Sequence, residues 1–212
     1  MNAERLGGRE APPTTSREIG LDWYGRELTG DDEYSGVLFV DCDFTELQNT
    51  GATFTECTFR NARFNASVHR DAAFVNCTFV RCNFFDAHFT GCKTIGSMFD
   101  GCTWDIVKIE GGDWSFVGLP GADLRSASIR GTRMREIDLT FANCAGAVMR
   151  DIDLSGALLG KADFTGTDLR GSDLTALDPL SADIARAIIT LDQTLAIAEG
   201  LRLDVRPNER DE

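Results

Sequence analysis

Carboxylates are the most abundant ionisable groups in this sequence. Aspartate and glutamate number 34 against 21 lysines and arginines, which gives a formal net charge of −13 and a pI near 4.6. A protein that binds nucleic acid directly needs lysine and arginine to displace phosphate counterions, so this balance argues against that class. It leaves open a protein partner that itself binds DNA, because rows of carboxylates attract a basic surface.

Cysteine and histidine are the residues best suited to hold a metal, and the chain has seven cysteines and two histidines. Metal sites built on cysteine use Cys-x-x-Cys pairs or a histidine close by, and neither pattern occurs here. We therefore predict no metal site and no cofactor. The thiols are expected to be structural and to pack as small apolar side chains.

Signatures of catalysis are also missing from the sequence. It has no glycine-rich phosphate loop, no HExxH and no GxSxG. His69 and His88 lie far from any cysteine or serine in a nucleophile context, and the aspartates are spread along the chain instead of forming a pair in a cleft. We predict a protein with no catalytic residues and no enzymatic activity.

A repeat of five residues carries all these groups. A large apolar side chain returns at every fifth position from Tyr34 to Leu174, and a small residue usually precedes it by two places. The breaks at the large position are Asn49, His69, Thr94 and Cys144. A period of five fits neither a helix nor a strand, so it indicates a solenoid whose units bury their inward residues only against neighbouring units.

The repeat resembles the pentapeptide-repeat family in segments such as Ala122–Ser126, Ala162–Gly166 and Ser172–Ala176. This resemblance implies an all-β solenoid over residues 21–189, a right-handed quadrilateral β-helix with four pentapeptides per coil. Residues 20 apart in sequence should then stack. The sequence supports that spacing independently, because one row at this interval consists of Phe39, Phe59, Phe79 and Phe99.

The repeat also gives expectations for the polar residues inside the coils. Cysteines 20 apart, such as Cys57 and Cys77, would stack with parallel side chains, a geometry that disfavours a disulfide. We expect His69 to turn outward, with Val68 taking its inward place. Asn49 is expected to form a side-chain ladder or turn hydrogen bonds within the coil.

Stacking at intervals of 20 assigns the residues to four faces, two of which are acidic and opposite each other. The Phe44 face is centred on Phe44, Phe64, Phe84, Trp104, Leu124, Cys144, Phe164 and Ile184. The Phe54 face is centred on Tyr34, Phe54, Phe74, Trp114, Met134, Leu154 and Leu174. Their aspartates either keep the rod soluble or imitate the potential of a nucleic-acid backbone, and the sequence alone does not decide between these two.

Both ends of the chain depart from the repeat. Residues 1–20 are polar and aperiodic, so we predict a disordered tail there and a second tail at 206–212. Tyr24 is in phase with the repeat and is expected in the first coil. Residues 190–205 change period: Thr190 and Gln193 have the form of a capping box, which predicts a helix over 191–199 followed by a short strand near 201–205.

This helix should cover an open solenoid end. It is either a monomeric lid or a dimer contact, and apolar groups on a second stripe favour a homodimer, as the family resemblance does. The predicted dimer interface consists of Leu191, Thr194, Leu195, Ile197, Ala198, Leu201 and Leu203.

Several stretches resemble the MfpA-like, quinolone-resistance branch of the family, namely Val68–Arg70, Ala73–Phe79, Thr94–Phe99, Leu119–Arg125 and Asp192–Ala198. The resemblance implies a homodimeric acidic rod that imitates B-DNA and binds DNA gyrase, inhibiting it or shielding it from fluoroquinolones. The residues expected to form its acidic partner-binding surface are Asp105, Asp113, Asp123, Glu136, Asp138, Asp153, Asp163, Asp173 and Asp183.

Two features differ from that branch: the N-terminal tail is longer, and the unbroken phase leaves no room for the projecting loops of some relatives, which weakens the case for loop-dependent protection. The alternative function is an interaction scaffold or a self-resistance factor with another protein partner. No apolar run approaches the 18 or so residues of a membrane span and residues 1–20 lack a hydrophobic core, so we expect a cytoplasmic protein without membrane contact.

Overall fold

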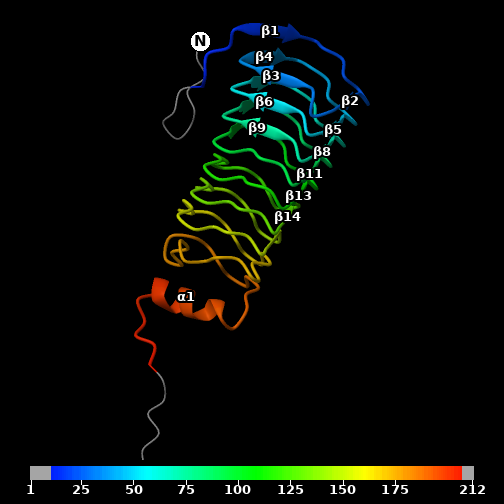
Figure 1. Ribbon diagram of the computed structural model, residues 1–212. Helices are drawn as coiled ribbons and strands as arrows, with labels where there is room; N and C mark the ends of the chain where they lie inside the picture. Colours follow the sequence, from blue (N-terminus) through cyan, green and yellow to red (C-terminus); the bar gives the residue numbers. More distant parts are fainter. Residues whose placement is uncertain (1–10, 207–212) are drawn as a thin grey trace, which may run out of the picture.

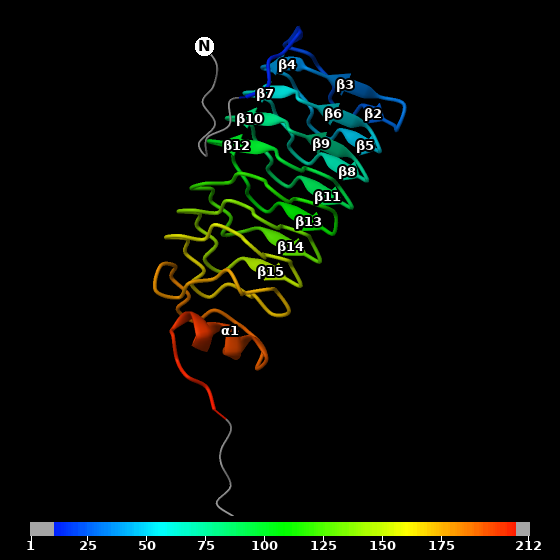
Figure 2. The same cartoon turned by 60° about the vertical axis from the view of Figure 1, so that its left-hand side comes forward.

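The computed structural model describes residues 11–206, which form a solenoid of stacked coils with one short helix at its C-terminal end (Figures 1 and 2). The chain climbs from the first coil to the last without leaving the column, so residues distant in sequence lie side by side only in adjacent coils. The predicted fold, a right-handed quadrilateral β-helix with a C-terminal helix, is confirmed.

Short parallel strands line three of the four faces. The first sheet holds β1 (Ser16–Ile19), β4 (Val37–Val40), β7 (Thr58–Arg60), β10 (Thr78–Val80) and β12 (Met98–Asp100). The second holds β2 (Glu27–Leu28), β5 (Gln48–Thr50), β8 (Val68–Arg70), β11 (His88–Thr90), β13 (Lys108–Glu110), β14 (Ser128–Arg130) and β15 (Val148–Arg150). The third holds β3 (Glu33–Ser35), β6 (Thr53–Thr55) and β9 (Ala73–Val75).

The two faces not named so far are called the Phe39 face and the Asn49 face, after an inward residue of each. The first sheet forms the N-terminal half of the Phe39 face, which continues through Leu119, Leu139 and Leu159. The second forms the Asn49 face, and the third begins the Phe54 face. The Phe44 face is joined through isolated parallel bridges such as Asp43 to Arg63 and Asp163 to Asp183.

The register between coils is 20 residues over most of the rod. Phe39 pairs with Phe59, and Phe79 pairs with Phe59 and Phe99. The rings in this row are stacked, with centroid distances of 4.9, 4.8 and 4.5 Å from one coil to the next. Offset aromatic pairs of this kind contribute about 0.5–1.5 kcal/mol each beyond the apolar area that they bury. The row predicted from the sequence is therefore confirmed.

A left-handed residue at most corners explains why the period is five. The position two places after the large inward residue has a positive φ, as at Glu46 (57°), Ala66 (52°) and Asp86 (52°). This conformation turns the chain from one face to the next, and for residues other than glycine it costs on the order of 1 kcal/mol. Glycine takes the same corner at Gly146 and Gly166, where no side chain opposes the positive φ.

The first complete coil is one residue longer than the others. Ser16 pairs with Val37, an offset of 21, whereas Glu33 pairs with Thr53, an offset of 20. The extra residue lies in the turn from Thr29 to Asp32, where the Thr29 amide donates to the Asp32 carboxylate at 2.8 Å and the Asp32 amide donates to the Thr29 carbonyl at 3.0 Å.

This insertion changes which aromatic residue enters the core. Trp23 is buried, whereas Tyr24 is 58% exposed. The expectation that Tyr24 follows the repeat phase was wrong, because the added residue shifts everything before it by one position. Trp23 packs edge-on against Phe39 and Phe44, at centroid distances of 6.1 and 5.4 Å.

The prediction of a disordered tail over residues 1–20 was also wrong near its end, at residues 16–19. Strand β1, Ser16–Ile19, pairs in parallel with β4 and adds an edge to the first sheet (Figure 1). Its four residues are all exposed, so backbone hydrogen bonds and not side-chain burial hold it in place. The first ten residues of that prediction, and 207–212 of the second tail, lie outside the described residues.

All four breaks in the repeat point into the core. Asn49, His69, Thr94 and Cys144 are each at most 1% exposed. The expectation that His69 turns outward was therefore wrong. Its ring stacks on Phe89 with a centroid distance of 4.7 Å.

A closed set of hydrogen bonds explains the inward position of His69. The side-chain oxygen Oδ1 of Asn49 accepts from the Ala52 backbone amide at 3.1 Å. This bond turns the side-chain nitrogen Nδ2 of Asn49 toward His69 Nδ1, at 3.3 Å. His69 Nδ1 is then an acceptor, so the proton is on Nε2, which donates to Ser67 Oγ at 3.0 Å. The Ser67 hydroxyl in turn donates to the Phe64 carbonyl at 2.7 Å. The hydrogen bonds predicted for Asn49 are confirmed.

The seven cysteines are free, and six of them are buried. Cysteines at the small inward position direct Sγ toward backbone carbonyls, as Cys82 does toward Phe59 O at 3.4 Å. Burial raises the pKa of Cys92 to about 11 and that of Cys144 to about 12, so both remain protonated at neutral pH. These thiols act as core side chains, as predicted from the repeat.

At the C-terminus, helix α1 runs from Gln193 to Gly200, close to the predicted range of 191–199. The short strand predicted after it does not form: residues 203–206 have no regular structure and are exposed. A strand there would need an edge to pair with, and the helix covers the last coil instead (Figure 2).

The buried imidazole should make folding stability depend on pH. Burial lowers the pKa of His69 to about 3, whereas an unfolded histidine takes up a proton below about pH 6.5. Its contribution to stability is therefore full above pH 6.5 and is lost as the pH falls toward 3, at up to about 1.4 kcal/mol per pH unit. We expect His69→Phe to flatten this part of the profile, measured as the urea midpoint between pH 7.5 and 4.5.

The same variant should be less stable at neutral pH. It leaves the Asn49 amide and the Ser67 hydroxyl without their shared partner, at a cost of about 1–3 kcal/mol. Equal slopes for the variant and the parent over pH 4.5–6.5 would contradict the assignment of a neutral, buried His69.

Candidate functional site

Aspartates at the position before the large inward residue are fixed to the backbone. On the Phe44 face, the Asp163 carboxylate accepts from the Thr165 amide at 2.8 Å, and Asp183 accepts from the Ala185 amide at 3.0 Å. The two aspartates form a parallel bridge in adjacent coils, which are about 4.8 Å apart as neighbouring strands are. Each carboxylate therefore has a set height on the rod.

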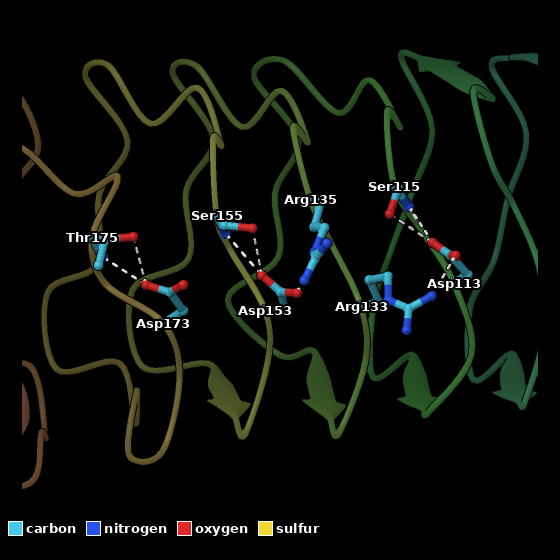
Figure 3. A network of polar contacts seen from close by, with 8 residues as sticks. All are labelled: Asp113, Ser115, Arg133, Arg135, Asp153, Ser155, Asp173 and Thr175. Carbon is cyan, nitrogen blue, oxygen red and sulfur yellow. Dashed lines mark hydrogen bonds and ion pairs between the residues drawn. The ribbon is translucent and has the colours of Figure 1, made fainter.

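The Phe54 face carries a second acidic row, made of Asp113, Asp153 and Asp173 (Figure 3). Each carboxylate accepts from the amide and the hydroxyl of the residue two places on. The hydroxyl donors, at 2.6, 2.7 and 2.7 Å, are Ser115, Ser155 and Thr175. The same pair of hydrogen bonds forms at all three aspartates, so the positions of their carboxylates follow the regular stacking of the backbone.

Arginines offset part of the charge on the Phe54 face. Arg133 Nη1 lies 3.2 Å from Asp113, and Arg135 Nε lies 2.6 Å from Asp153 (Figure 3). Within residues 11–206, Asp173 has no ion pair. The negative charges of two of the three carboxylates in this row are therefore offset by arginines of an adjacent coil.

The Phe44 face keeps more uncompensated charge near its C-terminal end. Asp123 pairs with Arg125 at 2.6 Å, but neither Asp163 nor Asp183 makes an ion pair with any described residue. Asp105 is exposed on the same face. This half of the face presents carboxylates that are ordered by the backbone and open to a partner's cations.

Local hydrogen bonds keep these carboxylates ionised. Arg125 lowers the pKa of Asp123, and the hydrogen bonds from Thr165 lower that of Asp163. Partial burial acts to raise the pKa of Asp153, but the bonds from Ser155 and Arg135 outweigh it and leave the pKa below its ordinary value. The negative charges of Asp123, Asp153 and Asp163 thus persist below the ordinary range of carboxylate titration.

The nine predicted acidic residues do not lie on one surface. The Phe44 and Phe54 faces hold seven of them. Glu136 is exposed at the corner between the Phe54 and Phe39 faces, where its φ is +51°. Asp138 lies on the Phe39 face and accepts from the amide and hydroxyl of Thr140 at 2.9 and 2.5 Å.

The sequence placed Arg125, Arg133 and Arg135 on the acidic faces, but the hydroxyls that orient the carboxylates were not predicted. A signal for the hydroxyls was present, because Asp-x-Ser or Asp-x-Thr recurs in phase with the repeat at 113–115, 138–140, 153–155, 163–165 and 173–175. No signal of that kind predicts the pairing of Arg135 with Asp153, since the two are 18 residues apart and meet only through coil stacking.

The C-terminal helix is attached to the solenoid by one buried side chain. Gln193 Nε2 donates to the carbonyls of Leu169 and Ser172, at 2.8 and 2.7 Å. Its Oε1 accepts from the Thr190 amide at 2.7 Å and so holds the residues before the helix, but the predicted capping box does not form, because the N-cap of α1 is Asp192, which makes no side-chain capping bond. The amide of Gln193 therefore satisfies two carbonyls that the end of the solenoid leaves open.

The predicted dimer residues divide into two groups. Ile197 packs partly buried against the core, next to Ala196, and Ala198 is half-buried. The remaining residues are exposed: Leu191, Thr194, Leu195, Leu201 and Leu203. Leu191, two residues before α1, is 86% exposed and Leu195 in α1 is 54% exposed, so apolar side chains at this end of the rod are left uncovered.

Two further observations bear on ligands and membranes. Residues 11–206 contain no group of three or more histidine, cysteine or acidic side chains placed to hold a metal ion. No helix in this part of the chain has the length and apolar character needed to cross a membrane.

The attachment of α1 can be tested at Gln193. Gln193→Leu should free two backbone carbonyls and destabilise the last coil by about 1–3 kcal/mol. Amide hydrogen exchange at Ile188, which donates to Thr167 O, should then accelerate. Gln48→Leu is the matched control, because the side-chain amide of Gln48 donates only to the exposed Glu46 carbonyl. This variant should leave exchange at Ile188 unchanged. Equal exchange at Ile188 in the two variants would reject the role assigned to Gln193.

Comparison with known proteins places this architecture. The family described as pentapeptide repeats (8 copies) matches residues 119–156 and 137–175. A solved structure of trypsin-treated QnrB1, described as a plasmid-mediated fluoroquinolone resistance protein, is 22% identical, covers 91% of this chain and 100% of its own, and has a TM-score of 0.50.

A second structure, HetL from the cyanobacterium Nostoc sp. strain PCC 7120, is described as a pentapeptide repeat protein involved in heterocyst differentiation regulation. It is 17% identical, covers 80% of this chain and 87% of its own, and has a TM-score of 0.38. No curated protein sequence matches the chain. The match to pentapeptide repeats covers residues 119–175, and stacked coils with the same five-residue spacing continue outside that range in the described part of the chain.

Proposed function

We propose that this chain is a non-enzymatic, cytoplasmic protein that binds DNA gyrase by imitating the charge of DNA, and that it inhibits the enzyme or protects it from fluoroquinolones. The observation that carries the proposal is the pair Asp163 and Asp183. Their carboxylates are ordered by the backbone, lie one coil apart and have no ion pair within residues 11–206. Likeness in fold to a fluoroquinolone resistance protein supports the choice of target.

Fixed rows of negative charge, and not an equal spacing, are the physical basis of the proposed mimicry. Carboxylates in one row of this rod repeat at multiples of about 4.8 Å, whereas phosphates along one DNA strand repeat at about 3.4 Å. A groove that binds DNA carries lysines and arginines, and an acidic rod of net charge −13 is attracted to them. Because the carboxylates are already ordered, binding costs less side-chain entropy than it would for a flexible acidic tail.

Of the two acidic faces, we assign the main contact to the Phe44 face. Arg133 and Arg135 neutralise two of the three carboxylates in the row Asp113, Asp153 and Asp173 on the Phe54 face. A partner would have to displace these arginines, whereas Asp163 and Asp183 are available at once. The C-terminal half of the Phe44 face therefore provides the stronger attraction for a basic groove.

The decisive variant replaces the three aspartates in the C-terminal half of the Phe44 row by asparagine: Asp123→Asn, Asp163→Asn and Asp183→Asn. The fold should tolerate this, because Asn83 and Asn143 occupy the same row and accept the same amide bonds, at 2.9 and 3.1 Å. In a supercoiling assay with purified gyrase we expect potency to fall roughly tenfold or more, equivalent to about 1.4 kcal/mol. The dependence of binding on salt should also weaken.

The matched control neutralises Asp113, Asp153 and Asp173 on the Phe54 face, which changes the net charge equally. It should lower potency less, since two of these carboxylates are already paired. Equal losses for the two triple variants would contradict the choice of face. Absence of any effect of the parent protein on supercoiling or on quinolone action at micromolar concentration would remove gyrase as the target, and a pull-down that recovers another protein would favour the scaffold function.

We further propose that two copies join through the uncovered apolar side chains at the α1 end into a longer rod. Leu195→Asp places a charge among these side chains, away from the half-buried Ile197, and should give a monomer in sedimentation. Tyr24→Asp, at a similarly exposed apolar position at the other end of the rod, should leave the mass unchanged. An unaltered mass for Leu195→Asp would reject the helix as the dimer contact.

A further inference from the structure

Two phenylalanines occupy strained corners on the surface of the C-terminal half. Phe116 is 54% exposed with a φ of +61°, and Phe141 is 62% exposed with a φ of +60°. A bulky side chain is unfavourable in this left-handed conformation, and neither ring is buried enough to offset the strain. The equivalent corners one coil earlier are glycines, Gly96 and Gly121. The fold therefore does not require an aromatic residue at either place.

Both rings border the same face. Phe116 lies at the corner where the chain enters the Phe39 face, and Phe141 at the corner where it leaves for the Phe44 face. Leu158 and Leu180, 56% and 70% exposed, lie on the same face. We name this set the apolar strip: Phe116, Phe141, Leu158 and Leu180.

Two earlier coils of the Phe39 face carry polar residues at the matching positions, although Leu38 and Met98 stand in the same row as Leu158. Thr58 and Thr78 stand in the row that Leu158 occupies later, and Asn61 and Arg81 hold the corner column of Phe141. A stacked coil is thus formed equally well with polar residues at these places. Other exposed apolar side chains, such as Ile19, Tyr24 and Phe85, lie in the N-terminal half, whereas both phenylalanines at strained corners lie in the half with the unpaired carboxylates.

Carboxylates form the rim of the apolar strip. Asp138 and Asp178 stand on either side of Leu158 in one row, each one coil away. Asp138 is fixed by Thr140, and Asp178 accepts from the Leu180 amide at 2.9 Å. Neither makes an ion pair with any residue that the structure describes.

One cation lies beside the apolar strip. Lys161 follows Phe141 in the corner column, and its ammonium lies 4.9 Å from the centre of the Phe141 ring. The Lys161 ammonium covers part of the ring and repels the positive charges of a basic partner. The same corner leads to the Phe44 face, where Asp163 is two residues farther on, so the apolar strip and the acidic row of that face are continuous.

We propose that the apolar strip is a second contact surface for the protein that the acidic row attracts, and that it fits an apolar patch rimmed by lysine or arginine on that partner. This inference rests on the proposed function. Charge alone would draw the rod to any DNA-binding groove, because DNA presents the same potential to all of them. Aromatic side chains that enter apolar pockets discriminate among such grooves, as interface hot spots do.

The test compares binding of the full chain to purified gyrase for variants at the two corners. Phe141→Gly and Phe116→Gly copy Gly121 and Gly96, so they relieve strain and should melt no lower than the parent. Each should weaken binding at least about tenfold without changing its dependence on salt. Tyr24→Ser, an exposed aromatic at the far end, should change binding less than about twofold.

A variant at Lys161 gives a result of opposite sign. Lys161→Asn, which follows Asn61 in the same corner column, uncovers the Phe141 ring and removes a positive charge. It should bind as tightly as the parent or more tightly. Weaker binding by Lys161→Asn would overturn the proposal, because the lysine would then be part of the contact.

The remaining outcomes separate this inference from the proposed function. If the parent binds gyrase and both glycine variants bind equally well, the apolar strip is not a contact and only this inference fails. If the parent does not bind, both fail together. If the glycine variants bind normally but sediment as monomers while the parent is a dimer, the apolar strip joins two copies of this chain and the proposal is wrong.

Discussion

Stacking of inward rows between adjacent coils is the constraint on which everything else in this protein depends. A five-residue unit cannot bury its large side chain alone, so each coil supplies the floor for the next. The 20-residue register meets two requirements at once, since it stacks rings such as Phe59 on Phe79 and pairs backbone groups such as Phe99 N with Gly118 O at 2.9 Å. Core packing and hydrogen bonding are therefore a single interaction here.

Aromatic rows alone would not define which coil follows which, because phenylalanine stacks equally well on any phenylalanine. The buried polar residues restrict this freedom. If one coil slipped by 20 residues, Asn49 and His69 would lose each other while remaining buried, at a cost of about 1–3 kcal/mol for each unpaired group. The network around His69 thus penalises an incorrect register that apolar packing would permit.

The same stacking determines where charged side chains stand on the surface. Because the backbone repeats at fixed intervals, a carboxylate bonded to it acquires a fixed position, as Asp163 does through Thr165. Arginines alter this pattern locally and make the two acidic faces unequal. Where the repeat tolerates polar residues but carries exposed phenylalanines instead, as at Phe141, the exception indicates a contact that packing does not explain.

Much of the molecule followed from the sequence. The period of five determined the solenoid, the interval of 20 determined the stacked phenylalanine row, the small inward positions accounted for the cysteines, and the change of period located the helix. Tertiary structure decided the placement of side chains that interact with residues in other coils. His69 turns inward because Asn49 and Ser67 receive it, Trp23 replaces Tyr24 because one turn residue shifts the phase, and Arg135 reaches Asp153 across a coil boundary. A linear pattern gives the spacing of side chains, but it does not show which groups satisfy one another once they are buried.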